Sequence, residues 1–139
     1  MPVLLLDTCA IVFIAEGQTI DPSARQQIRA ASLAGGILVS PVSAWEIGLL
    51  AAKGQLTFLL HPNAWFRSFL SNSDVRLTPL TPEIAPGDAI ESSFLPRLHS
   101  DPADRLLIAT ARALGVPIVT RDRRILAYAE AGFVAAIAC

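Results

Sequence analysis

The fold of this chain is decided by the stretch VLLLDTCA, which covers residues 3–10 of a sequence of 139 residues. Its continuous apolar run lacks the alternation of a half-exposed strand, so it predicts a strand over residues 3–7 that is buried on both faces, as in a parallel sheet. Thr8 then begins a predicted helix over residues 8–16, which ends at Gly17. A strand that leads directly into a helix is the first half of a βαβ unit.

The same alternation of strands and helices continues to the end of the chain. We predict further strands over residues 37–40, 75–80, 116–120 and 133–138. We predict further helices from Pro22 to about Leu33, from Ser43 to about Lys53, over 62–70, from Thr81 with a kink or break at Pro86-Gly87, over 102–114 and over 123–131. The helices at residues 22 and 102 begin with Asp-Pro pairs, in which the acid caps the helix and proline takes the first helical position. The pattern predicts a single α/β domain over residues 1–139, with a mainly parallel sheet between helices.

The composition favours a soluble protein with apolar surface left for a partner. Hydrophobic residues make up 53% of the chain, and the mean hydropathy is +0.50. No apolar run approaches the roughly 18 residues of a membrane span, and the N-terminus lacks the charged region of a signal peptide. We therefore predict a cytoplasmic protein with no membrane partner. The helix after residue 43 is apolar on more than one face, which indicates a protein interface. Its apolar residues include Trp45, Ile47, Leu49 and Leu50.

The basic residues are unevenly distributed along the chain. The net charge of −1 argues against a protein that binds nucleic acid through overall basic charge, but six of the 11 basic residues lie between Arg97 and Arg124. Such a cluster either holds phosphate or forms a salt-bridged surface, and the sequence leaves both open.

The cysteines and histidines indicate no site of their own. Cys9 and Cys139 form neither a disulfide framework nor a zinc motif, so we predict two small buried thiols. His61 and His99 have no spacing that favours a Ser-His-Asp arrangement. We expect both at the surface, with His99 near the mouth of any site beside residue 101.

Four acidic residues lie where predicted strands end or predicted helices begin. They are Asp7, Glu46, Asp104 and Asp122. In open α/β sheets, ligands bind at the carboxyl edge of the strands, and an oxygen-rich group there suits Mg²⁺ or Mn²⁺. Such an ion offsets the repulsion among clustered carboxylates and activates water for attack on a phosphodiester. The sequence therefore predicts metal-dependent phosphoryl chemistry.

Asp104 is predicted to lean toward the sheet. The inward face of the helix over 102–114 is expected to carry Leu107, Ile108, Ala111 and Leu114. Asp104 shares that face by helical spacing, and an ionised carboxylate there needs a cation or several donors. Three hydroxyl residues lie close in sequence to the acids and could bond a carboxylate or a metal-bound water. They are Thr8, Ser40 and Thr120.

Each acid also has a purely structural explanation, which the residues alone leave open. Asp7 and Asp122 could cap the helices that follow them. Ser43 and Glu46 fit the capping box S-x-x-E, in which the two side chains satisfy each other's backbone N–H groups. Asp101 fits the N-cap position of the helix over 102–114, and the dipole of that helix favours an acid such as Asp104 in the first turn.

Four segments together resemble the PIN-domain ribonucleases, of the VapC type found as toxins in bacterial toxin–antitoxin pairs. They are LLLDTCA at residues 4–10, SAWEI at 43–47, HSDPADRLLIATA at 99–111 and VTRDRRI at 119–125. The resemblance covers essentially the whole chain. It implies a three-layer α/β/α sandwich, RNA cleavage with Mg²⁺ or Mn²⁺, a homodimer, and a cognate VapB-type antitoxin that covers the site.

The resemblance also assigns residues to that site. The family's catalytic and metal-binding acids fall on Asp7, Glu46, Asp104 and Asp122. Asp101 belongs to the same motif but is assigned mainly to helix capping. Thr120 matches the family's small polar residue near the metal, and Thr8 is a further neighbour.

Together these features predict a metal-dependent endoribonuclease that acts as a toxin by inhibiting translation. The arginines expected to contact RNA phosphate are Arg105, Arg121, Arg123 and Arg124. A receiver-like signalling domain would need a lysine late in the chain, whereas the only lysine is Lys53. A catalytically silent PIN-like module that binds RNA or a protein partner stays open as the alternative, although all four acids are present.

Overall fold

The fold is built around a five-stranded parallel sheet in the order β3-β2-β1-β4-β5, with β1 in the middle. The computed structural model describes residues 2–72, 74–79, 95 and 101–139. The strands are β1 (Leu4–Leu6), β2 (Ile37–Val39), β3 (Val75–Leu77), β4 (Ile118–Thr120) and β5 (Ala136–Ala138). The helices of the described part are α1 (Thr8–Ala15), α2 (Pro22–Leu33), α3 (Pro41–Ala52), α4 (Pro62–Asn72), α6 (Pro102–Leu114) and α7 (Arg123–Glu130). The helix predicted from Thr81, with its break at Pro86-Gly87, lies outside the described residues.

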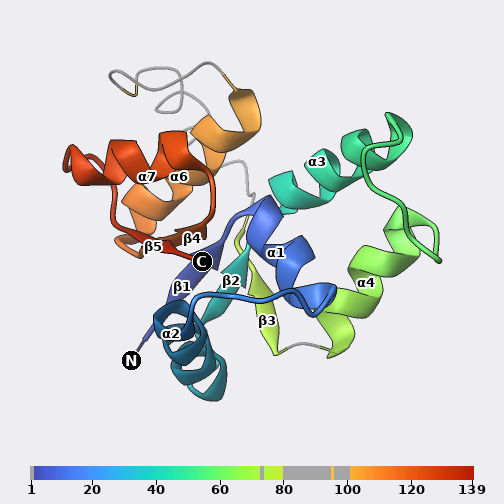
Figure 1. The fold of residues 1–139 in the computed structure, drawn as a ribbon, viewed down its shortest axis with the longest axis horizontal. Helices are drawn as coiled ribbons and strands as arrows, with labels where there is room; N and C mark the ends of the chain where they lie inside the picture. The colour runs from blue at the N-terminus through green and yellow to red at the C-terminus, as the bar shows by residue number, and fades with distance from the viewer. Residues whose placement is uncertain (1, 73, 80–94, 96–100) are drawn as a thin grey trace.

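The sheet separates two apolar layers, as the alternation of side chains along β1 requires. Leu4 and Leu6 pack in a cluster with residues of α1, α2, α3 and α4, whereas Leu5 packs with residues of α6 and α7. All three leucines are at most 4% exposed. Figure 1 shows α6 and α7 on one side of the strands and α1 and α2 on the other. The predicted three-layer α/β/α sandwich is confirmed, with every strand pairing parallel.

The turn between α2 and β2 uses two adjacent glycines for different reasons. Gly35 has a φ of +68°, a left-handed conformation that glycine adopts without steric cost. A Cβ at Gly36 would lie 2.0 Å from the carbonyl oxygen of Pro2. Only a residue without a side chain allows the chain to enter β2 this close to the start of β1.

The start of α3 differs from the predicted capping box. The helix begins at Pro41, and its N-cap is Ser40, whose hydroxyl accepts a hydrogen bond from the N–H of Val42 at 3.1 Å. Proline at the first helical position fixes a helical φ, so the helix starts at Pro41, two residues before Ser43. Glu46 therefore lies well inside α3 and is not part of a cap.

Two predictions about burial are also wrong. Leu107, Ile108 and Ala111 of α6 are at most 1% exposed, but Leu114 is 47% exposed. Leu114 is the last residue of α6, and the chain turns away at Gly115 in a left-handed conformation, so this end of the helix face stays open to solvent. Cys9 is exposed and Cys139 is half-buried, so neither is a buried thiol.

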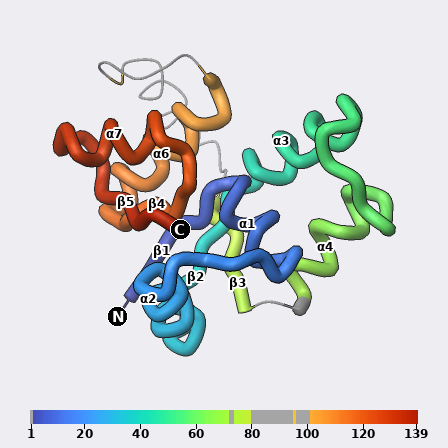
Figure 2. The backbone as a smooth tube through the Cα atoms, viewed as in Figure 1, coloured from blue at the N-terminus to red at the C-terminus, as the bar shows by residue number. Residues whose placement is uncertain are grey.

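Helices α3 and α4 and their connection, residues 41–72, extend away from the sheet as an arm, seen on the right of Figure 2. One side of α3 packs on the body of the molecule, since Ile47 is 1% exposed, while Trp45 is 53% exposed. The apolar character of α3 on several faces thus leaves apolar side chains open to solvent. Within the described part of the chain, no helix is long and apolar enough to cross a membrane.

Candidate functional site

The acidic residues meet at the carboxyl edge of the central strands, where four helices begin or pass. Asp7 follows β1 and caps α1, and Asp122 follows β4 and caps α7. Asp101 caps α6, in whose first turn Asp104 lies, and Glu46 projects from α3. The strands place the acids from β1 and β4 side by side, because Leu6 of β1 is in register with Val119 of β4. Three of these acids, Asp7, Asp101 and Asp122, are therefore helix caps as well as members of the acidic cluster.

Asp7 is the most deeply buried of these acids, at 3% exposed. One carboxylate oxygen accepts a hydrogen bond from the N–H of Ala10 at 2.7 Å, and the other accepts one from the hydroxyl of Thr120. Burial raises the pKa of Asp7 to about 7, the two hydrogen bonds oppose that rise, and the nearby charges of Asp104 and Glu46 add to it. With this pKa, the Asp7 carboxyl group changes between its protonated and its charged form near neutral pH.

Glu46 of α3 is held by a hydroxyl group from α1. The Thr8 hydroxyl donates to Oε1 of Glu46, and its oxygen lies 3.1 Å from the hydroxyl oxygen of Ser43. Burial raises the pKa of Glu46, the bond from Thr8 lowers it, and the charges of Asp104, Asp101 and Asp122 raise it further. The charges of Asp104, Asp101 and Asp122 thus all disfavour the charged form of Glu46.

Three of the acids can offer ligands to one ion. Among the described residues, Glu46, Asp101 and Asp104 each place a carboxylate oxygen within 4.8 Å of the other two. Asp101 also accepts a hydrogen bond from the N–H of Asp104 at 3.1 Å, which confirms its capping role. The ligand atoms are all carboxylate oxygens, the type preferred by Mg²⁺ and Mn²⁺. The residues present therefore fit a hard divalent cation.

Asp122 lies at the edge of this group and is paired with an arginine. The guanidinium of Arg124 donates to both carboxylate oxygens of Asp122, at 3.3 and 3.0 Å. Burial acts to raise the pKa of Asp122, but the hydrogen bonds and charge of Arg124 outweigh it and hold the pKa of this carboxyl below its ordinary value. Thr120 links the two strand-end acids, since it donates to Asp7 and accepts from the N–H of Asp122 at 3.0 Å.

Comparison with known proteins decides the family. The family model for the PIN domain matches residues 4–131. The chain belongs to the PIN-domain family. It is similar to ribonuclease VapC22 of Mycobacterium tuberculosis, with 33% identity over 127 residues that cover 90% of this chain and 91% of that protein.

Solved structures show the same PIN fold over nearly the full length of the chain. The VapBC2 complex of Rickettsia felis, bound to a DNA fragment from its promoter, aligns with a TM-score of 0.69 and 14% identity, covering 99% of this chain and 98% of the other. The DNA-bound VapBC complex of Salmonella typhimurium aligns with a TM-score of 0.63 and 17% identity, covering the same shares. At these identities the likeness concerns the fold.

The four arginines singled out from the sequence occupy different positions on the PIN domain. Arg121 donates to the carbonyl oxygens of Thr19 at 2.7 Å and Cys139 at 3.1 Å, and its guanidinium lies 4.0 Å from the ring centre of Phe13. These contacts tie the chain between α1 and α2 to the end of β5. The side chain expected to bind RNA is engaged in holding the fold.

Two further arginines, Arg105 and Arg123, differ in their exposure. Arg105 donates to the carbonyl oxygen of Leu95 at 3.1 Å and is half-buried. Arg123 is exposed on the first turn of α7. Both Arg97, from the basic cluster, and His99, expected near the mouth of the site, lie outside the described residues.

Sequence reasoning placed one hydroxyl residue differently and missed another. Ser40 was expected beside the acids, and the structure shows its hydroxyl capping α3. Ser43 was read only as a helix cap, yet its fully buried side chain contacts Thr8 next to Glu46. The signal for Ser43 was its position three residues before Glu46, because residues three apart lie on the same helix face.

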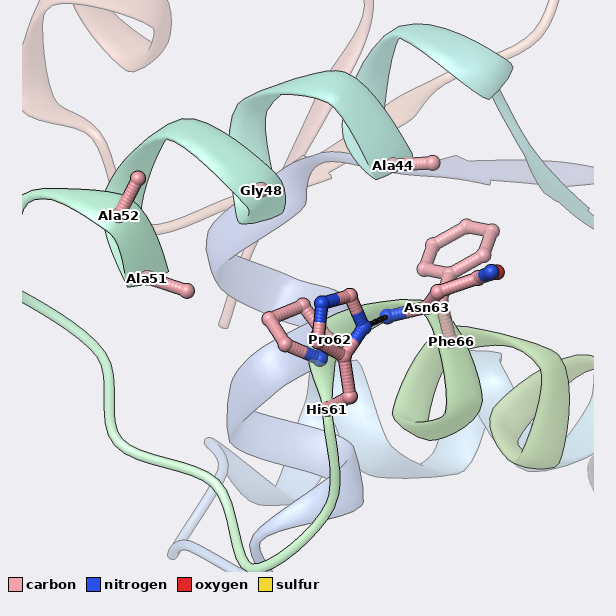
Figure 3. Close-up of a pocket in the computed structure, with 8 residues that line it drawn as sticks. All are labelled: Ala44, Gly48, Ala51, Ala52, His61, Pro62, Asn63 and Phe66. Atoms are coloured by element: carbon pink, nitrogen blue, oxygen red, sulfur yellow. Dashed lines mark hydrogen bonds between the residues drawn. The ribbon is translucent and has the colours of Figure 1, made fainter.

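A separate cavity of about 480 Å³ lies in the arm between α3 and α4, and Figure 3 shows its lining. Small residues of α3 form one wall, opposite the start of α4, where Nδ1 of His61 accepts a hydrogen bond from the N–H of Asn63 at 3.2 Å. The full lining is Ala44, Gly48, Ala51, Ala52, His61, Pro62, Asn63 and Phe66. These described lining residues include none of the clustered acids, so the cavity is separate from the acidic site.

Proposed function

We propose that this PIN-domain chain is a metal-dependent endoribonuclease and the toxin of a toxin–antitoxin module. The observation that carries the proposal is the convergence of Glu46, Asp101 and Asp104 within 4.8 Å of one another, beside the buried Asp7. Carboxylates that raise each other's pKa are unfavourable unless a cation joins them. The similarity to a protein described as a ribonuclease supports the choice of RNA as the substrate.

Glu46, Asp101 and Asp104 would hold Mg²⁺ or Mn²⁺, with Asp7 and Asp122 completing the acidic site. When bound, the ion supplies Lewis acidity that activates water and offsets the charge of the phosphodiester. Asp101 joins the proposed ligands because its free carboxylate oxygen can bind while it caps α6.

The hydroxyl groups orient these acids. Thr8 donates to Glu46 and Thr120 donates to Asp7, so each carboxylate is held in one direction before any ligand arrives. Ser40 acts indirectly, since it fixes the start of the helix that carries Glu46.

RNA would approach the exposed side of the site, where α7 begins. Arg124 and Arg123 would meet its phosphates, and their exposure at the start of α7 supports this role. Arg105 and Arg121 have less part in RNA binding, since each donates to backbone carbonyls within the fold.

A protein partner is part of the proposal. Three of the similar structures are described as VapBC or toxin–antitoxin complexes, which supports a VapB-type antitoxin and a cytoplasmic setting. The arm offers apolar surface to such a partner or to a second copy in a homodimer, since Trp45 is 53% and Leu60 is 52% exposed.

We further propose that residues 1–139 act as one domain.

The test is RNA cleavage by purified protein with Mg²⁺, with Mn²⁺ and with EDTA. We expect cleavage only with metal, and loss of at least about 100-fold in rate in Glu46→Gln and Asp104→Asn, because each removes a charged ligand from the site. Glu130→Gln is the matched control, since Glu130 is an exposed acid at the far end of α7.

Cleavage in EDTA, or full activity in both site variants, would refute the metal mechanism. RNA that is bound but left intact with either metal would support the silent binding module instead. For the toxin role, induced expression of the wild type should arrest growth and Asp104→Asn should not, so equal growth arrest by both would contradict it.

A further inference from the structure

Arg124 occupies an unusual position for an exposed side chain, because it reaches two acids of the site at once. Its terminal nitrogen lies 3.0 Å from Oδ2 of Asp122 and 3.7 Å from Oδ2 of Asp104. The Arg124 side chain is 59% exposed, whereas those of Asp122 and Asp104 are 21% and 12% exposed. The guanidinium therefore covers the solvent side of largely buried carboxylates.

The contact with Asp122 is the stronger of the two. Asp122 accepts hydrogen bonds from the side chain of Arg124 and also from its backbone N–H, at 2.8 Å. The bond to Asp122 is the largest contribution to the raised pKa of Arg124, and the charges of Asp104 and Asp101 add to it. Two-point bonds of this kind fix the guanidinium plane, while a single contact at 3.7 Å is easily given up.

We propose that Arg124 is the internal counter-cation of the acidic site, and that its contact with Asp104 and the binding of a divalent metal exclude each other. The inference rests on the proposed metal site. A guanidinium and a divalent ion are both positive and both draw on the carboxylate of Asp104, and their mutual repulsion at this distance opposes binding of both at once. Asp122 keeps its hydrogen bonds with Arg124 whether Asp104 contacts the arginine or a metal.

The hydrogen bonds to Asp122 give the Arg124 side chain a second role when it no longer contacts Asp104. With Asp104 committed to a metal, the guanidinium would keep its bonds to Asp122 and would have N–H donors left for another acceptor. A phosphate group of RNA bound at the acidic site would offer such an acceptor to Arg124. Arg124 thus acts as a positioning residue that changes partner from carboxylate to phosphate when the metal binds.

The first measurement is the affinity of RNA-free protein for Mn²⁺, by isothermal titration calorimetry. We expect Arg124→Ala to tighten the Mn²⁺ dissociation constant by about three- to tenfold, the effect of removing one partly exposed competing charge. Arg123→Ala removes the same charge from the neighbouring exposed position and should stay within about twofold of the wild type. Circular dichroism confirms that the variants remain folded.

The second measurement follows the arginine itself. In NMR spectra of the wild type, adding diamagnetic Mg²⁺ should shift the side-chain Nε–H resonance of Arg124 and leave that of Arg123 in place. If Arg124→Ala binds Mn²⁺ no more tightly than Arg123→Ala, or if the Arg124 resonance does not move, the inference is wrong although the metal site stands. If the wild type binds neither ion, the inference and the proposed metal site both fail.

Discussion

At the scale of single residues, Asp7 combines a structural role with an electrostatic penalty. It caps α1, yet burial raises its pKa from 3.8 to about 7. A group whose pKa is higher in the folded state binds its proton more tightly there. Its contribution to stability is therefore present at low pH and is lost as the pH rises from about 4 to about 7. Without metal, the folded protein carries a destabilised carboxylate at neutral pH.

Asp7→Asn should consequently stabilise the metal-free protein at pH 8. Asparagine is as good an N-cap as aspartate, so the bond from Ala10 can persist while the buried charge is removed. We expect a melting temperature above that of the wild type in EDTA at pH 8, with the difference shrinking toward pH 5, where Asp7 is protonated. Thermal unfolding followed by circular dichroism at both pH values checks this. A difference that does not depend on pH would show that the charge of Asp7 is not the cause.

At the scale of elements, α6 shows which part of an amphipathic face the sheet actually covers. Leu107 is fully buried against Leu5 and Ile118, whereas Leu114, on the same predicted face, is 47% exposed. Leu107→Ala should lower the free energy of unfolding by about 2–5 kcal/mol because it opens a cavity. Leu114→Ala should lower it by less than about 1 kcal/mol. Urea denaturation of the two variants provides the comparison, and equal losses would contradict the assigned burial.

Helix starts could be predicted where the local signal was unambiguous. Asp21-Pro22 and Asp101-Pro102 begin α2 and α6 as expected, because an acid followed by proline satisfies the first backbone N–H groups and fixes the first helical φ. Ser40-Pro41 carries the same signal, but the capping-box pattern from Ser43 competed with it. The structure shows that proline decides the boundary.

The site could be predicted as far as the sheet order determines it. Asp7 and Asp122 were placed correctly at the carboxyl ends of β1 and β4, because strand ends can be located from the apolar runs. The different contacts of Arg121 and Arg124 could not be predicted from the sequence. They depend on which side chain meets Phe13 and which meets Asp104, and such contacts arise only from the packing of distant segments.

At the scale of the whole molecule, the acids come together only when the chain is folded. Glu46 lies on α3 and Asp104 on α6, and these two helices are far apart in the sequence. A divalent ion should therefore bind the folded state and stabilise it by mass action, by about 2.7 kcal/mol at 100 times its dissociation constant. We expect Mn²⁺ at pH 8 to raise the melting temperature of the wild type above its value in EDTA and to leave that of Asp104→Asn unchanged. Differential scanning calorimetry checks this, and an equal rise in both proteins would indicate binding elsewhere.

The central position of β1 has a consequence for synthesis. β1 is made before its two neighbours in the sheet, because Leu5 pairs with Leu38 of β2 on one side and Ile118 of β4 on the other. It therefore lacks its second neighbour until β4 has been made. Asp7 and Glu46 leave the ribosome early, but Asp101, Asp104 and Asp122 are added only after residue 100. For a nuclease of the kind proposed, a nascent or prematurely terminated chain is inert. The cell that translates it would be exposed to the activity only after Asp122 has been added and β4 has joined the sheet.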